Sequence, residues 1–154
     1  MRGKNVFMES LIGHGVEYIF GNPGTTESPI LDALLDYPRL RYVVALHEGV
    51  ALGAASYYAQ TSGQPAVVNL HTAAGTGNAM GSLIAAYRAN TPLIVTAGQQ
   101  TREMLLCDPY LTNRDETLLP QPWVKWSYQP ARAEDVPAAF MRAYAVAVQP
   151  PAGP

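Results

Sequence analysis

The sequence is poor in charged residues and has very little cysteine. Charged side chains make up 14% of its 154 residues, well below the figure of about a quarter that is usual for soluble domains. We therefore expect part of the surface to be covered by another domain or subunit. The single cysteine, Cys107, cannot form an internal disulfide, so a reducing compartment, the cytoplasm, is the expected location.

Long apolar runs, strong net charge and metal-ligand spacings are also missing. No window reaches 18 apolar residues, so we expect no membrane span. Glu9, His14 and Glu17 interrupt the apolar residues near the start, so no signal-peptide core is expected there. The net charge of −2 gives no reason to expect nucleic acid or an anionic membrane as a partner. No spacing of cysteine, histidine and carboxylate residues suggests a metal site.

Apolar runs typical of strands alternate with helix-like segments along the whole chain. This alternation is the signature of an α/β domain. We predict one domain over residues 1–154, an open and mainly parallel sheet with helices on both faces. A long excursion with at most one helical turn is expected over residues 102–122. The expected strands are 18–20, 41–46, 65–70, 93–97 and 124–128, and the expected helices are 6–12, one that Thr25 or Thr26 caps, 48–60, 75–89 and 133–148.

Three polar residues follow strand-like runs at equal spacing. Thr25 lies 23 residues before Glu48, and His71 lies 23 residues after it. The carboxyl ends of strands in an open parallel sheet share one edge, where ligands bind. A hydroxyl, a carboxylate and an imidazole are therefore predicted to converge on one crevice.

Glu48 has a structural interpretation and a chemical one. A carboxylate at a helix N-terminus interacts favourably with the helix dipole. Apart from the adjacent His47, however, the local sequence offers Glu48 no charged partner. If Glu48 is buried without a partner, its pKa should be raised, as a proton-shuttling acid requires.

The other two residues and the glycines also leave alternatives open. Thr25, with Gly24 before it, is compatible either with an anion site at a helix N-terminus or with ordinary N-capping. His71 is either a hydrogen-bonded structural residue or a catalyst.

Gly75–Gly81 has the spacing G-x-G-x-x-x-G, one residue longer than the dinucleotide fingerprint, which disfavours a conventional NAD or ATP site. These glycines are better explained by close approach of a ligand or a neighbouring chain. The small residues of segment 48–60 indicate either close packing on the sheet or a subunit interface.

Several segments in the same order resemble the N-terminal, pyrimidine-binding domain of thiamine-diphosphate-dependent 2-oxo acid decarboxylases of the benzoylformate decarboxylase type. The resemblance extends from about Val6 to Pro154. It is carried by residues 20–24 (FGNPG), 45–48 (ALHE), 69–81 (NLHTAAGTGNAMG), 93–102 (LIVTAGQQTR) and 124–128 (VKWSY).

The resemblance implies roles for the three spaced residues. Glu48 matches the glutamate that hydrogen-bonds N1′ of the cofactor aminopyrimidine and favours its imino tautomer, which activates the thiazolium. His71 matches a histidine that transfers protons. Thr25 matches a serine that contacts the carboxylate of the 2-oxo acid substrate, and its extra methyl group is expected to narrow the pocket. The resemblance further places Pro23, Ala73, Gly75 and Asn78 around the pyrimidine.

The resemblance also implies that the chain is part of a larger enzyme. The family binds the diphosphate and its Mg²⁺ through a separate domain with a Gly-Asp-Gly motif, and no such motif occurs here. The expected partner is that domain, from the full-length enzyme or from a second subunit of a homo-oligomer such as a dimer. The chain alone is expected to be inactive. The alternatives are an acetolactate synthase-like or oxalyl-CoA decarboxylase-like relative, or a non-catalytic domain that self-associates or binds nucleotides.

Overall fold

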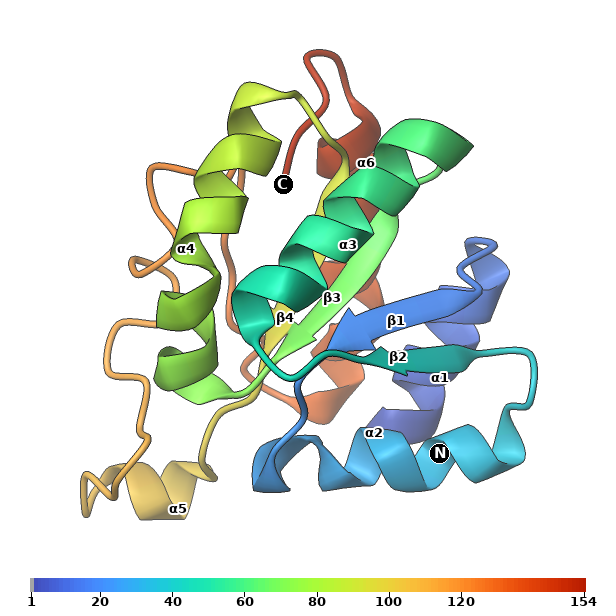
Figure 1. The fold of residues 1–154 in the computed structure, drawn as a ribbon. Helices are drawn as coiled ribbons and strands as arrows, with labels where there is room; N and C mark the ends of the chain where they lie inside the picture. The colour runs from blue at the N-terminus through green and yellow to red at the C-terminus, as the bar shows by residue number, and fades with distance from the viewer. Residues whose placement is uncertain (1) are drawn as a thin grey trace.

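The computed structural model describes residues 2–154, which form an α/β fold around a four-stranded parallel sheet (Figure 1). The strand order is β2-β1-β3-β4. The strands are β1 (Tyr18–Gly21), β2 (Arg41–Val44), β3 (Ala66–Leu70) and β4 (Leu93–Ala97). The helices are α1 (Gly3–Gly13), α2 (Ser28–Ala33), α3 (Glu48–Ser62), α4 (Thr72–Arg88), α5 (Arg102–Leu105) and α6 (Val136–Val148), with short 3₁₀ turns at Thr25–Glu27, Leu34–Asp36 and Ala133–Asp135.

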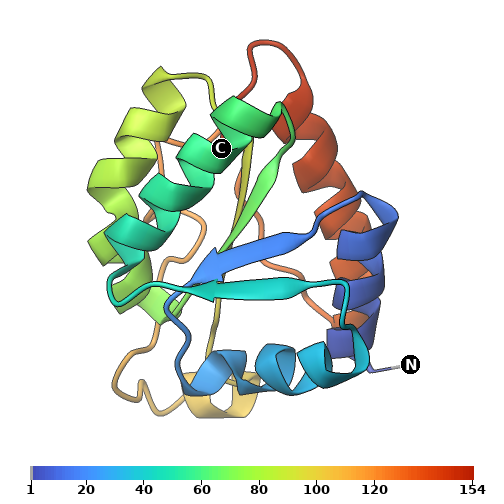
Figure 2. The same ribbon diagram turned by 45° about the vertical axis from the view of Figure 1, so that its right-hand side comes forward.

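Helices cover both faces of the sheet, as the sequence predicts (Figure 2). One face packs against α3 and α4, and the other packs against α1, α2 and α6. Successive strand residues point to opposite faces, so Ile19 enters one core while Phe20 enters the other. Val67 and Val68 divide in the same way. Burying each such side chain contributes about 1.5–3 kcal/mol, which fixes the register of the central strands.

Small residues bring α3 and α4 close together. The Ser82 hydroxyl on α4 donates a hydrogen bond to the Gly49 carbonyl on α3 over 2.8 Å. Ala51, Ala55 and Ala59 are buried on the inner side of α3. These three small side chains therefore serve packing within the fold, while Gly53, Ala54 and Tyr57 on the same helix are exposed.

Two predicted elements differ from the structure. Residues 124–128 form no strand, because within residues 2–154 this segment pairs with none of the four strands of the sheet. The helix predicted to begin at Gly75 begins at Thr72, because His71 occupies the cap position and its carbonyl accepts a hydrogen bond from the Gly75 N–H over 2.8 Å. The glycines of residues 75–81 therefore lie inside a helix rather than in a loop.

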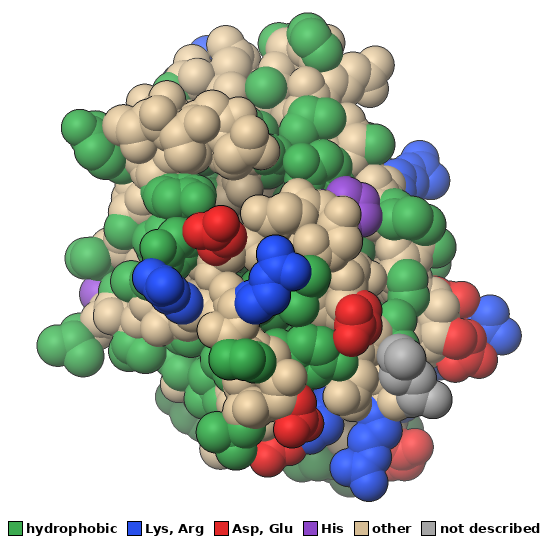
Figure 3. All heavy atoms as spheres, turned by 90° about the vertical axis from the view of Figure 1, so that its right-hand side faces the viewer, with side chains coloured by type: hydrophobic (Ala, Val, Ile, Leu, Met, Phe, Trp, Pro, Cys, Tyr) green, Lys and Arg blue, Asp and Glu red, His purple; other side chains and the backbone are tan. Residues whose placement is uncertain are grey.

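Acidic and basic side chains are mixed on the face turned toward the viewer in Figure 3, and they lie next to one another in its lower half. Lys4 of α1 and Asp32 of α2 form an ion pair. None of the helices within residues 2–154 combines the length and apolarity needed to cross a bilayer.

Candidate active site

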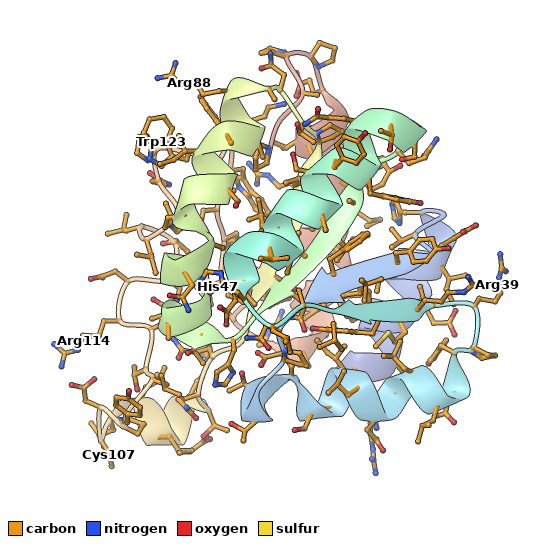
Figure 4. All side chains as sticks on the ribbon, in the orientation of Figure 1. Arg39, His47, Arg88, Cys107, Arg114 and Trp123 are labelled. Atoms are coloured by element: carbon orange, nitrogen blue, oxygen red, sulfur yellow. The ribbon has the colours of Figure 1, made fainter. Side chains whose placement is uncertain are left out.

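The site lies at the carboxyl edge of the sheet, where β1, β2 and β3 end next to one another. Gly21, the last residue of β1, is in register with Val44 of β2 and with Asn69 of β3. The chain after each strand therefore starts from the same edge, the position where open parallel sheets bind ligands. In Figure 4, the labelled His47 lies at the start of α3, on the side that faces α4.

Glu48 is buried at this edge between two amide side chains. Its exposed fraction is 7%. Asn22 Nδ2 donates to Glu48 Oε1 over 3.1 Å, and Asn78 Nδ2 donates to Oε2 over 3.0 Å. A Cβ on Gly75 would lie 3.3 Å from Glu48 Cγ, so the glycine lets the first turn of α4 approach the carboxylate. Each oxygen of Glu48 therefore accepts a hydrogen bond from one of the two amides.

The prediction of a raised Glu48 pKa is wrong for this chain. Burial acts to raise the pKa, but hydrogen bonds from Asn78, from the Glu48 backbone N–H and from Asn22 together lower it below the usual value. These donors stabilise the charged form of the carboxyl group. Glu48 is therefore an ionised acceptor whose partners come from the loop after β1 and from α4, neither of which is adjacent in sequence.

Glu27 forms a second carboxylate cluster that the sequence analysis did not identify. It is 1% exposed. Glu27 Oε2 lies 2.8 Å from His71 Nδ1 and accepts the Gly24 N–H over 2.8 Å, while the Thr26 hydroxyl donates to Oε1. An ionised carboxylate only accepts hydrogen bonds, so the proton between Glu27 and the imidazole belongs on Nδ1. His71 Nε2 is then the ring nitrogen available for exchange with a ligand.

Two glycines make room for the Glu27 and His71 side chains. A Cβ on Gly24 would overlap the His71 ring, and a Cβ on Gly98 would overlap the carboxylate of Glu27 and the hydroxyl of Thr26. Both positions lie outside the helices and strands. Glycine at these two positions is therefore a condition for the carboxylate and the imidazole to meet.

Thr72, directly after His71, is strained. Its φ is 52°, in the left-handed region that β-branched residues rarely adopt. The side chain is fully buried, and its Oγ1 has no hydrogen-bond partner within residues 2–154. Strain and an unpaired hydroxyl each cost free energy. The turn that presents His71 is therefore held in place by the surrounding packing, against its local preference.

A chain of hydrogen bonds crosses the sheet just below this edge. The Tyr42 hydroxyl on β2 donates to Asn69 Oδ1 over 3.1 Å, and Asn69 Nδ2 donates to Thr96 Oγ1 on β4 over 3.0 Å. Burial and then the negative charge of Glu27 raise the pKa of Tyr42 far above its ordinary value. Tyr42 is therefore a neutral phenol that holds the outer strand to the carboxyl edge.

The structure brings some of the predicted site residues together and leaves others apart. Glu48 and Asn78 are in direct contact, and Gly75 lies against Glu48. His71 lies at the same edge, paired with Glu27. Thr25 is exposed, and no hydrogen bond within the described residues joins its side chain to Glu48 or His71. The remaining predicted lining residues, Pro23 and Ala73, are partly buried.

Asn22, Thr26 and Glu27 were missed by the sequence analysis. Glu27 follows Gly24 by three residues at a helix-like start, the spacing of a capping box, and this spacing could have identified it. Asn22 stands in a turn of Gly, Asn and Pro, a composition that gives no sign of a contact with Glu48. Among residues 2–154, no group of three or more His, Cys, Asp or Glu side chains is arranged to hold a metal ion.

The chain is similar to known proteins in sequence and in fold. Residues 1–118 match the family "Thiamine pyrophosphate enzyme, N-terminal TPP binding domain". The chain is 49% identical over 147 residues to a benzoylformate decarboxylase of Pseudomonas aeruginosa, covering 95% of this chain and 27% of that protein.

Solved structures show the same fold at high similarity. A Mycobacterium smegmatis protein described as thiamin diphosphate-dependent is 62% identical with a TM-score of 0.95, covering 100% of this chain and 29% of the other. Benzoylformate decarboxylase from Polynucleobacter necessarius is 51% identical with a TM-score of 0.94, covering 99% and 28%. The chain spans less than a third of the length of each of these relatives. It belongs to the thiamine pyrophosphate enzymes and corresponds to their N-terminal TPP-binding domain.

Proposed function

We propose that this chain is the pyrimidine-binding part, over residues 1–154, of a thiamine-diphosphate-dependent decarboxylase of benzoylformate-like 2-oxo acids. One observation carries this proposal. Glu48 is an ionised carboxylate, almost fully buried, held by two amide donors at the carboxyl edge of the sheet. The identity of 49% to a benzoylformate decarboxylase supports the substrate class.

The residues at this edge fit an aminopyrimidine. Such a ring offers ring nitrogens and an exocyclic amino group, which need one charged acceptor and neutral polar neighbours. Glu48 supplies the acceptor, and Asn22 and Asn78 prevent the carboxylate from turning away. The missing side chain of Gly75 leaves the approach to Glu48 Cγ open. Pro23 and Ala73, both partly buried, are the proposed apolar contacts of the ring.

Each residue has a proposed task in the reaction. The bound cofactor supplies an electron sink for the carbon–carbon bond cleavage of the 2-oxo acid. Glu48 exchanges a proton with a ring nitrogen of the pyrimidine. His71 moves a proton through Nε2, while Glu27 keeps the proton on Nδ1 and fixes the ring orientation. The hydroxyl of Thr25 is the proposed contact of the substrate carboxylate.

The complete site requires partners beyond residues 1–154. We propose that a separate domain binds the diphosphate and Mg²⁺, and that this domain belongs to a second subunit of a cytoplasmic homodimer. Exposed apolar side chains on α3 and after β2, such as Val50 at 61% and Leu46 at 95%, support burial against another subunit. The chain alone should then lack decarboxylase activity and bind thiamine diphosphate weakly or not at all.

The test uses the full-length protein with thiamine diphosphate, Mg²⁺ and benzoylformate. Release of carbon dioxide with benzaldehyde is the expected result. Glu48→Gln keeps the size of the side chain and removes the charge, so it should slow turnover at least about 100-fold, as expected for a lost proton-transfer group. It should leave the circular dichroism spectrum unchanged. An active protein whose turnover is unchanged by Glu48→Gln would remove the residue from the mechanism.

Product analysis separates the alternatives. A carboligated product, formed when an acceptor aldehyde is added, would indicate an acetolactate synthase-like reaction instead. A melting temperature that rises with AMP or NAD but not with thiamine diphosphate would contradict the proposed cofactor. It would favour a non-catalytic nucleotide-binding domain.

A further inference from the structure

The chain passes from β3 through His71 directly into α4 (Figure 1), and this short link contacts both glutamates that are buried at the edge of the sheet. On one side, the His71 imidazole pairs with Glu27 over 2.8 Å. On the other side, Gly75 in the first turn of α4 lies against Glu48. Each residue has only two freely rotating backbone bonds, so the backbone angles of Thr72 set how the helix is directed relative to the imidazole.

Both ends of this link are anchored by hydrogen bonds. The Leu70 carbonyl, at the end of β3, accepts the Gly98 N–H over 3.1 Å. The Thr72 carbonyl, at the start of α4, accepts the hydroxyl of Thr76 over 2.9 Å, and Thr76 is itself buried. The strand and the helix are therefore held independently, and the chain changes direction within two residues.

Thr72 makes this change of direction in a backbone conformation that its side chain disfavours. Its φ of 52° lies in the left-handed region, and such strain persists only where the surrounding structure enforces it. The side chain is fully buried, and within residues 2–154 its hydroxyl has no hydrogen-bond partner. The hydroxyl thus gains nothing from the conformation, which indicates that the role of this residue lies in its backbone.

Two helices of this fold begin after a histidine, and the two imidazoles behave differently. His47 precedes α3, and its Nδ1 accepts the Gly49 N–H of its own helix over 3.0 Å. His71 precedes α4 but makes no side-chain hydrogen bond to the N-terminus of that helix. Its Nδ1 instead meets Glu27, which lies in the segment after β1. One ring therefore caps its own helix, whereas the other is turned toward a distant carboxylate.

The difference between the two histidines lies in the residue that follows each of them. Both histidines have extended backbones themselves. Glu48, after His47, has no positive φ, whereas Thr72, after His71, does. An ordinary first helical residue thus accompanies a ring that turns back on its own helix, and a left-handed one accompanies a ring that reaches outward.

We propose that Thr72 is the positioning residue of His71. Its left-handed backbone directs the imidazole away from the N-terminus of α4 and toward Glu27, so that Nδ1 carries the proton and Nε2 can accept one. The ring of His47 has the opposite tautomer, because its Nδ1 is the acceptor. The inference rests on the proposed function only for the proton transfer by His71, since the tautomer is a property of the chain itself.

Substitutions at position 72 of the full-length protein separate the backbone from the side chain. Proline suits the first position of a helix and follows an extended residue such as His71 without conflict, but it holds φ at about −65°. Thr72→Pro therefore permits α4 and forbids the left-handed turn. Thr72→Gly reaches positive φ without strain. Thr72→Val keeps the branched shape and removes only the hydroxyl.

The tautomer of His71 is the first measurement. ¹H–¹⁵N NMR shows which nitrogen of a neutral ring carries the proton, and His71→Asn identifies the signals of this residue. The proton should lie on Nδ1 in the unsubstituted protein and in the glycine and valine variants. In Thr72→Pro it should move to Nε2, because Nδ1 then accepts the Ala73 N–H as in the cap formed by His47. A proton that stays on Nδ1 in a folded proline variant overturns the proposal.

The proposal remains open to contradiction if the proline variant does not fold. An Nε2 proton on His71 in the unsubstituted protein would then overturn it without any substitution. The same proton in Thr72→Gly would overturn it too, because it would assign the positioning to the side chain. A proton on Nδ1 in both proteins, beside an Nε2 proton on His47, supports it.

Turnover is the second measurement. Thr72→Pro should lower kcat by the same factor as His71→Ala, about 100-fold, and the double variant should lose no more than either single one. Affinity for thiamine diphosphate should stay at its unsubstituted value, because Asn78 and Glu48 keep their contact. A proline variant with full turnover overturns the proposal. An unsubstituted protein without decarboxylase activity contradicts the proposed function instead, and the tautomers still decide the role of Thr72.

Discussion

Glu48 and Glu27 are two glutamates buried at one edge of one sheet, and their surroundings differ in kind. Neutral amides hold Glu48, and they lower its pKa without sharing a proton with it. Glu27 is held by an imidazole, a hydroxyl and a backbone N–H, and only 1% of it is exposed. The first arrangement leaves a charged acceptor for a ligand, whereas the second uses the charge to orient another side chain.

The largest expected difference between the two is in stability. Glu27→Ala leaves the His71 Nδ1–H, the Gly24 N–H and the Thr26 hydroxyl without their acceptor, so the free energy of unfolding should fall by about 3 kcal/mol. Glu48→Ala should cost about 1 kcal/mol, because the exposed amide of Asn78 can turn to water. Urea denaturation measures both, and equal losses would mean that the two carboxylates do not differ in this way.

Thr72 tests whether the turn between the two carboxylates is strained. Thr72→Gly removes the penalty of a positive φ, roughly 1–2 kcal/mol, whereas Thr72→Ala keeps it. The glycine variant should therefore be the more stable by about 1 kcal/mol, although glycine is worse than alanine inside ordinary helices. Thermal unfolding of the two variants checks this order. If the alanine variant is the more stable, His71 is presented by a relaxed turn.

Tyr42 tests the influence of the Glu27 charge on stability at high pH. The pKa of Tyr42 is raised in the folded state by burial and by the charge of Glu27, while the unfolded chain titrates near its usual value of about 10. The unfolded state then releases this proton first, so stability is full below about pH 10 and is lost as the pH rises further. Tyr42→Phe should remove this part of the alkaline loss. Unfolding curves from pH 8 to 11 for both proteins, compared by difference, measure it.

Substitution of Asn78 tests the surroundings of Glu48 and has the smallest expected effect on stability. Its amide stabilises the Glu48 carboxylate, so Asn78→Ala should raise the pKa of Glu48. In the unsubstituted protein this carboxylate contributes stability that is present above its unfolded pKa and is lost as the pH falls through the lower, folded pKa. The variant should lose less on acidification. Carboxyl ¹³C chemical shifts give the titration directly, with Asn90→Ala, an exposed asparagine beyond the end of α4, as the control.

Much of the fold was predictable because the strands are apolar without alternation. Runs such as 66–70 and 93–97 read clearly as buried parallel strands. Segment 124–128 (VKWSY) has the alternation of apolar and polar residues that is also typical of strands, but a strand requires a hydrogen-bonded neighbour, which composition does not supply. The start of α4 was misplaced because glycine composition suggested a loop, whereas His71 caps the helix before the glycines begin.

The site was predictable only in part. Equal spacing brought Glu48 and His71 to one edge, and the structure places both there. A raised pKa was expected for Glu48 because the local sequence shows no partner. Its donors, Asn22 and Asn78, are 26 and 30 residues away in sequence. The pairing of Glu27 with His71 spans 44 residues. Contacts of this range come from the way the strands are ordered, which no local pattern records.

Gly98 carries a consequence for how the sequence can change over generations. A Cβ at this position would overlap the carboxylate of Glu27 and the hydroxyl of Thr26. A side chain at position 98 is therefore tolerated only together with smaller side chains at both position 26 and position 27. Positions 26, 27 and 98 are expected to vary as a group among descendants of this protein, and a library randomised at position 98 alone should return glycine.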